Sequence, residues 1–198
     1  MSTAGTQGTA LASGARAIGA RAGTLWRFSR PHTIVGTTVS VIALYAIAAA
    51  AGHASGALDL AATLLAAWCV NVAIVGLNQI EDVDIDRVNK PGRPLVTGAL
   101  TLREGWVFTW IFYALAIVPT WAVVVYPHVT WIDKITAPLG AHETFFIYLA
   151  GLVFTLVYSV PSWGRTKAHG MLANWTIAIP RGCLLKVAGW AMVARIGH

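Results

Sequence analysis

Four long runs without Asp, Glu, Lys or Arg constrain the fold of this chain more than any other feature. Each run has at least 21 residues, and together they cover residues 31–58, 60–80, 105–132 and 144–164. About 20 apolar residues of α-helix are enough to cross the hydrocarbon core of a bilayer. Charged residues make up 11% of the chain, whereas soluble domains contain about 25%. The sequence therefore predicts a membrane protein with several spans. It excludes a disordered chain and argues strongly against a soluble domain of ordinary design.

The charge-free runs predict an all-α fold, a polytopic transmembrane bundle of about five helices. The expected spans are residues 33–51, 60–78, 105–126, 144–161 and 171–194. Arg181 and Lys186 lie inside the fifth span, and a mid-span arginine costs about 2.5–3.5 kcal/mol on insertion scales. Arg181 lies between a proline and a glycine, which suits a broken helix with the arginine facing a polar cavity. The alternative is that this segment does not span the membrane.

Lysine and arginine gather on one side of this expected topology. Ten of them lie in the N-terminal tail and in the loops after the second and fourth spans, whereas the opposite loops hold only Lys134. Because positive loops stay in the cytoplasm, we expect the N-terminus there, with the protein in the cell membrane. An organelle membrane is the less favoured alternative. The net charge of +6 is then explained by loops beside anionic lipid, and no nucleic acid partner is expected.

The first 24 residues differ from the rest of the chain. Ala, Gly, Ser and Thr dominate residues 1–24, which carry Arg16 and Arg21 and no acidic residue. This composition predicts a disordered cytoplasmic tail and is not typical of a signal peptide, with an organelle transit sequence as the alternative. Residues 25–198 are expected to form one transmembrane domain.

Half of the eight acidic residues lie in one short segment at the end of the second expected span. Asn78, Asp82 and Asp86 are each four residues apart, which places them on one face of a helix, and Asp84 lies off that face. Two carboxylates a turn apart suit Mg²⁺, which binds one or two protein carboxylates and completes its shell with water and substrate phosphate. The alternative is a solvated helix end with local ion pairs, such as Asp84 with Arg87.

Basic residues follow these acids directly. Pro91 and Gly92 end the helix and turn the chain, which holds Lys90 and Arg93 near the carboxylates. Cations beside a pair of acids suit a metal-bridged polyanion such as a diphosphate, whose remaining charge must be neutralised. The alternative is the ordinary cytoplasmic excess of positive charge, which also accounts for Arg103.

Three stretches of the sequence resemble the UbiA superfamily of intramembrane prenyltransferases. NQIEDVDID at 78–86, followed by NKP at 89–91 and RPL at 93–95, resembles the first aspartate-rich motif, NxxxDxxxD. FSRPHT at 28–33 and VGLNQ at 75–79 are similar to the homogentisate phytyl/prenyltransferase branch. YSVP at 158–161, with Arg165 and Lys167 after it, is similar to the YSxP segment and basic loop of the family.

The resemblance implies that this chain forms part of a nine-helix bundle that transfers a prenyl group from a prenyl diphosphate to an aromatic acceptor, with Mg²⁺ as cofactor. It implies that Asp82 and Asp86 are catalytic and hold the metal together with Asn78. The residues expected to bind the diphosphate or the acceptor are Arg30, Asn78, Lys90, Arg93, Tyr158, Lys167 and, from its place in the fifth span, Arg181. The expected partners are a prenyl diphosphate, a homogentisate-like acceptor and the lipid bilayer.

The second aspartate-rich motif of the family has no counterpart in this sequence, because no acidic residue follows Glu143. Three explanations stay open: a truncated product, a second chain that supplies the missing half, or a degenerate homologue that binds isoprenoid diphosphate without turnover. Whether the chain is an enzyme by itself stays open with them. A cation channel is disfavoured, since the acids lie at a helix end beside cations.

Overall fold

The computed structural model describes residues 3–52, 57–124 and 130–192, with side chains from residue 14 onward apart from 131, 181, 182 and 185. All regular structure in these ranges is helical. The longer helices are α1 (Thr3–Ser29), α2 (Ile34–Ala50), α3 (Ala57–Glu81), α5 (Leu102–Ile117) and α7 (Glu143–Ser159). The shorter ones are α4 (Val83–Asn89), α6 (Trp131–Ile135), α8 (Gly170–Ala178) and α9 (Leu185–Ala191). Single 3₁₀ turns are η1 (Pro31–Thr33), η2 (Val118–Ala122), η3 (Leu139–Ala141), η4 (Pro161–Trp163) and η5 (Thr166–Ala168), and η6 (Ile179–Leu184) is a π-helical turn.

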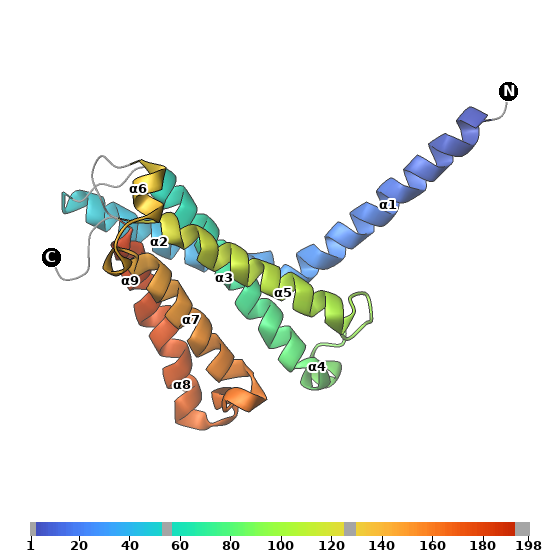
Figure 1. The fold of residues 1–198 in the computed structure, drawn as a ribbon. Helices are drawn as coiled ribbons and strands as arrows, with labels where there is room; N and C mark the ends of the chain where they lie inside the picture. The colour runs from blue at the N-terminus through green and yellow to red at the C-terminus, as the bar shows by residue number, and fades with distance from the viewer. Residues whose placement is uncertain (1–2, 53–56, 125–129, 193–198) are drawn as a thin grey trace.

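The arrangement confirms the expected all-α membrane bundle (Figure 1). The five expected spans fall on α2, on α3, on α5 with η2, on α7, and on α8 through α9. Among the described residues, three stretches are long and apolar enough to cross a membrane, namely Gly14–Ala50, Ala57–Glu81 and Leu102–Ala122. Helix α7 is apolar as well but shorter, at 17 residues.

The last helical segment is continuous but irregular. Helix α8 passes through η6 into α9, and Pro180 lies in this π-helical turn. Because proline has no N–H group and clashes with an ordinary α-helical turn, the wider turn accommodates it. The helix is therefore irregular at Pro180, as expected, but it widens into a π-helical turn and does not break. The side chain of Arg181 lies outside the described residues, so its direction stays a prediction.

The N-terminal segment is helical in the structure, where the sequence led us to expect a disordered tail over residues 1–24. Helix α1 includes residues 3–24 and continues to Ser29. Alanine and arginine are strong helix formers, and the end of α1 is held by packing, since Phe28 is fully buried against α3 and α5. Composition alone did not reveal this anchor, because it depends on residues far along the chain.

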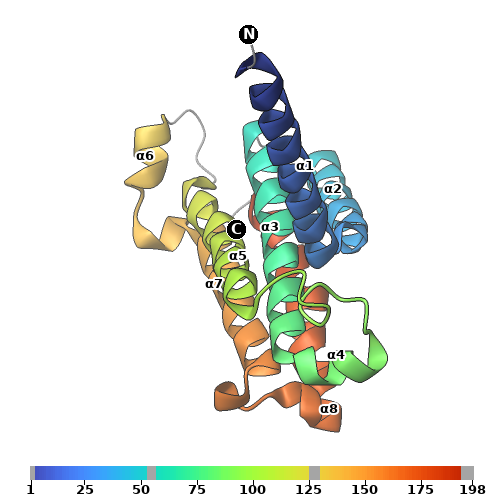
Figure 2. The same ribbon diagram turned by 90° about the vertical axis from the view of Figure 1, so that its right-hand side faces the viewer.

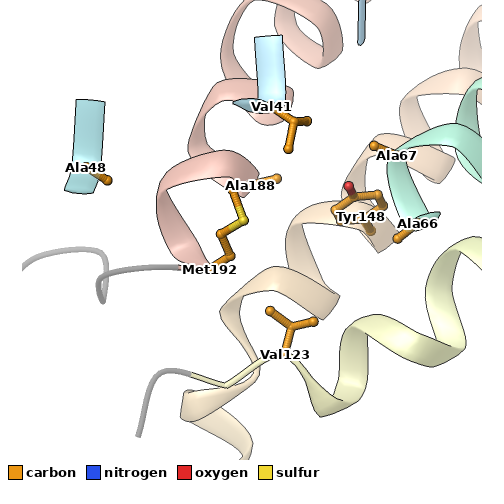
Figure 3. Packing of buried hydrophobic residues seen from close by; sticks show 8 residues of the cluster. All are labelled: Val41, Ala48, Ala66, Ala67, Val123, Tyr148, Ala188 and Met192. Carbon is orange, nitrogen blue, oxygen red and sulfur yellow. The ribbon is translucent and has the colours of Figure 1, made fainter. Parts of the chain in front are cut away.

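Helix α3 lies at the centre of the bundle (Figure 2) and packs along α5, with further contacts to α1, α2 and α7. One buried cluster of apolar side chains lies between the helices (Figure 3). Half of its members are alanines, whose small side chains let membrane helices approach closely enough for van der Waals packing. The cluster joins α2, α3, α7 and α9 and consists of Val41, Ala48, Ala66, Ala67, Val123, Tyr148, Ala188 and Met192.

The close contact between α3 and α5 depends on Gly76. A Cβ atom at this position would overlap Oγ1 of Thr109 on α5, which is itself fully buried. We expect Gly76→Ala to lower the free energy of unfolding by about 1–3 kcal/mol through overpacking. Unfolding by SDS in mixed micelles would measure this. Gly36→Ala on α2, where a Cβ meets no atom within 4 Å, is the matched control, and an equal loss in both variants would contradict the prediction.

Candidate metal and diphosphate site

Asn78, Asp82 and Asp86 keep their predicted four-residue spacing although the helix is interrupted at Asp82. Helix α3 ends at Glu81 and α4 begins at Val83, with Asp82 at φ −108° and ψ 12° between them. The backbone nevertheless keeps its spacing, because the N–H of Asp82 donates to the carbonyl of Asn78 (3.1 Å) and the N–H of Asp86 donates to that of Asp82 (2.8 Å). The three polar residues therefore follow one another at single-turn intervals, as expected.

Asp86 is buried and paired with cations from the turn that follows α4. Its side chain is 4% exposed and forms an ion pair with Arg93, whose side chain is 14% exposed. Lys90 lies 3.9 Å from the other carboxylate oxygen and is more exposed. The turn is closed by the N–H of Arg93, which donates to the carbonyl of Lys90 (3.1 Å). The placement of Arg93 near the acids is therefore as the sequence predicted.

Asp82 is paired with cations from a distant part of the chain. Nζ of Lys167 lies 2.8 Å from Oδ1 of Asp82, and the guanidinium of Arg165 lies 3.4 Å from the same oxygen. Both cations come from the segment between α7 and α8, which lies at the same end of the bundle as α4 (Figure 2). No described residue contacts Oδ2 of Asp82 within hydrogen-bond or ion-pair distance, which leaves that oxygen for a ligand.

Asn78 is oriented by the end of α7. The hydroxyl of Ser159, a fully buried residue, donates to Oδ1 of Asn78 at 2.5 Å. Asn78 also lines a cavity together with Tyr158 of α7 and Thr176 of α8. A hydrogen bond of this kind fixes the direction of a ligating side chain, so Asn78 is held at the boundary between the acids and the cavity.

A second, mostly apolar cavity continues toward the middle of the bundle. Ile74 and Pro180 line both cavities, and the deeper one lies between α2, α3, α7 and η6. Asn71 supplies a polar spot in its wall, where its amide donates to the hydroxyl of Thr37 (3.2 Å). The described residues thus form a polar mouth at Asn78 that leads to an apolar interior.

The structure brings most of the predicted site residues together, with exceptions. Arg30 contacts His32 (3.5 Å) at the start of α2 and has no contact with the acids among the described residues. Asp84 forms the exposed local pair with Arg87 at 3.0 Å that was the alternative reading of the acid cluster. That reading is correct for this pair, whereas Asp82 and Asp86 have different, less exposed partners. The Arg181 side chain is not among the described ones.

Two further residues belong to the site although the sequence did not single them out for a role. Arg165 contacts Asp82, and Ser159 contacts Asn78. Ser159 lies in the YSVP segment and Arg165 lies just after it, so their position at a recognised motif could have marked them as site residues. What the motif alone could not provide was the partner of each side chain, more than 80 residues away in sequence.

The charges of the site favour a metal bound together with an anion. Two carboxylates are faced by four cations, so the site has an excess of two positive charges. The described residues form no group of three or more His, Cys, Asp and Glu side chains that could hold a metal alone. Mg²⁺ needs only one or two protein carboxylates when water and phosphate oxygens complete its shell. The donor set of Asn78, Asp82 and Asp86 therefore fits Mg²⁺ in the company of a diphosphate.

Comparison with known proteins identifies the family of the chain and agrees with its fold. The model of the UbiA prenyltransferase family matches residues 39–197, and the chain belongs to that family. It is 34% identical over 180 residues to the homogentisate phytyltransferase of Synechocystis sp., which covers 87% of this chain and 51% of that protein. It is 36% identical over 164 residues to a probable homogentisate phytyltransferase 2 of Oryza sativa, covering 81% of this chain and 39% of that protein. The chain therefore spans about half of these curated relatives or less.

Solved structures share the fold. A digeranylgeranylglyceryl phosphate synthase matches with a TM-score of 0.71 at 20% identity, over 88% of this chain and 54% of that one. A UbiA homologue from Archaeoglobus fulgidus, solved with GPP and Mg²⁺ bound, matches with a TM-score of 0.66 at 22% identity, over 87% of this chain and 55% of that one. At these identities the likeness establishes the architecture of the bundle.

Proposed function

We propose that this protein is a membrane prenyltransferase, which transfers a prenyl group from a prenyl diphosphate to an aromatic, homogentisate-like acceptor with the help of Mg²⁺. The observation that carries the proposal is the excess of positive charge around Asp82 and Asp86, which follow Asn78, a residue that lines a cavity continuing into the apolar interior. A diphosphate with one metal ion keeps a net negative charge, which is opposite in sign to the excess of the site, and a prenyl tail is as apolar as the cavity. The names of the Synechocystis and rice relatives support the choice of acceptor.

The reaction follows from this arrangement of side chains. Asn78, Asp82 and Asp86 would hold Mg²⁺, which when bound polarises the phosphate oxygens and stabilises the leaving group. Arg93 and Lys167 are placed to donate to the diphosphate oxygens and to neutralise the charge that develops when the C–O bond to the prenyl carbon breaks. Pyrophosphate leaves with the electron pair, a ring carbon of the acceptor bonds to the allylic carbon, and the ring then loses a proton.

The apolar cavity has two roles in this scheme. It accommodates the hydrocarbon tail, and it keeps water away from the allylic cation, which water would otherwise consume. Tyr158 lies in the polar mouth beside Asn78, where the reactive end of the prenyl group would lie. We propose that Arg30 and Arg181 contribute to the acceptor side of the same site.

A second candidate is a protein that binds an isoprenoid diphosphate without transferring it, alone or as one subunit of a larger membrane protein. The ion pairs favour this candidate as much as the first, since the same cations would hold the diphosphate whether or not transfer follows. For both candidates we propose that the protein lies in the cell membrane with the site facing the cytoplasm. The basic loops lie at the same end of the bundle as Asp82 and Asp86, and positively charged loops stay in the cytoplasm.

Labelled geranylgeranyl diphosphate and homogentisate, given to the full chain in nanodiscs with Mg²⁺, separate the two candidates. A transferase releases pyrophosphate and yields a prenylated aromatic product, and Asp82→Asn abolishes both. Mg²⁺-dependent binding without product would support the binding protein instead. If the diphosphate does not bind with Mg²⁺ present, both candidates are wrong.

A further inference from the structure

Helix α1 leaves the bundle, and its N-terminal part extends away from the other helices (Figure 1). All described side chains from residue 14 to residue 23 are exposed. The direction of α1 is set by a break before α2, where Arg30 has a φ of +48° and Pro31 begins a 3₁₀ turn. Because of this break, α1 does not continue the axis of α2 (Figures 1 and 2).

The exposed part of α1 has an apolar face and a basic face. The apolar side chains recur at intervals of three or four residues and are Ala15, Ile18, Ala22 and Trp26. Ile18 is 72% exposed and Trp26 is 65% exposed, which is unfavourable for large apolar side chains in water. Arg16 and Arg27 are about three turns apart and share another face. At 100° per residue, the centre of the basic face lies about 125° around the helix from the centre of the apolar face, so the two faces are separate.

A contact with α5 sets the level of α1 in the bilayer. Arg21 pairs with Glu104 in the first turn of α5 and donates to the carbonyl of Ala99 (3.4 Å). This turn follows the basic loop after α4, so it lies at the membrane surface on the side of the acidic site. The groove between α1 and α5 is lined by Arg21 and Arg103 near the first turn of α5 and by Val107 and Ile111 further along that helix. This change from charged to apolar side chains matches the change from headgroups to acyl chains in one leaflet of a bilayer.

We propose that α1 lies in the plane of the membrane surface and binds anionic phospholipid. Its apolar face enters the boundary between headgroups and acyl chains, and Arg16 and Arg27 contact the headgroups. Helices with an apolar face, a basic face and low overall hydrophobicity bind membranes in this way. No acidic residue precedes Asp59, so nothing in this part of the chain repels a negative surface.

Spin labels on the two faces of α1 test the proposal in the full chain. Cys69 and Cys183 are first replaced by alanine, and a label is attached at Ile18→Cys or, as the matched control, at Ala20→Cys on the other side. The vesicles are phosphatidylcholine with about one third phosphatidylserine. We expect the label at 18 to be relaxed more by oxygen than by a water-soluble nickel chelate, and the label at 20 to show the reverse.

The charge of α1 is tested with Arg16→Gln and Arg27→Gln in the same background. Each arginine near an anionic surface strengthens attraction about fivefold, so the double variant should shift the label at 18 toward water. Vesicles of phosphatidylcholine alone should have the same effect on the original chain. If both labels contact water equally in the anionic vesicles, α1 does not lie on the membrane. If the double variant changes nothing, anionic lipid is not the partner.

Discussion

Replacing Asp86 by alanine should lower the free energy of unfolding by about 3–5 kcal/mol. The Asp86 carboxylate is buried and paired with Arg93, whose side chain is itself 14% exposed. The substitution leaves that guanidinium inside the protein without a partner, and it removes one of the two negative charges that balance the cations of the site. Unfolding by SDS in mixed micelles, followed by circular dichroism, measures the loss.

Asp84 provides the control for this experiment. It lies in the same short helix and is also paired with an arginine, but its side chain is 89% exposed and that of Arg87 is 66% exposed. Exposed pairs contribute little, so Asp84→Ala should change stability by no more than about 0.5 kcal/mol. Replacing both Asp86 and Arg93 by leucine should recover much of the loss, since no charge is then left unpaired. Equal losses from the two alanine variants would contradict the assigned burial of the pair.

Asp82→Asn should weaken Mg²⁺-dependent binding of geranyl diphosphate by at least about 100-fold. Loss of a residue that only supports a metal ligand costs about 10–100-fold in metal affinity, and Asp82 is proposed as a ligand itself. The substitution keeps the shape of the side chain but removes the charge that faces Lys167 and Arg165. Calorimetry with and without Mg²⁺ measures the change, and Asp84→Asn is the control. Undiminished binding by the Asp82 variant would mean that the metal binds elsewhere.

Lys167→Met should have opposite effects on the binding of a metal ion alone and on the binding of the diphosphate. Lys167 lies 2.8 Å from Oδ1 of Asp82, so in the proposed site it would compete with a metal ion for that carboxylate and would also help to hold the diphosphate. The variant should therefore bind Mn²⁺ alone more tightly, by about tenfold for one neighbouring charge removed, and bind geranyl diphosphate more weakly. Electron paramagnetic resonance measures the free Mn²⁺. A fall in both affinities would indicate a general loss of structure instead.

The four-residue spacing of the acidic motif predicted the order of its side chains correctly, although the helix is interrupted within the motif. Asn78, Asp82 and Asp86 do not lie on one unbroken helix, since Asp82 lies between the end of α3 and the start of α4. They keep their order because the four-residue hydrogen bonds continue through the break. The cations at positions 90 and 93 were also predictable, because a proline and a glycine between them force the chain to turn back within a few residues.

The contacts between segments far apart in the chain could not be predicted from the sequence. Residues 1–24 were expected to be disordered because their composition is polar and rich in small residues, yet they are part of α1. Arg21 pairs with Glu104 of α5, and Phe28, just after this segment, packs on α3 and α5. Arg165 and Ser159 were visible beside a motif, but their partners lie at the other end of a long stretch of chain.

A helical membrane bundle with acids and cations at one end could be predicted from the amino-acid sequence, because charge-free runs and residue spacing act locally along the chain. The pairing of each cation with its carboxylate could be seen only in the folded protein. Asp82 takes its partners from the segment after α7, and Asp86 takes Arg93 from the turn that follows α4. Ion pairing and burial depend on how α3, α7 and α8 pack in space, and helix packing depends on contacts that no single segment of the sequence contains.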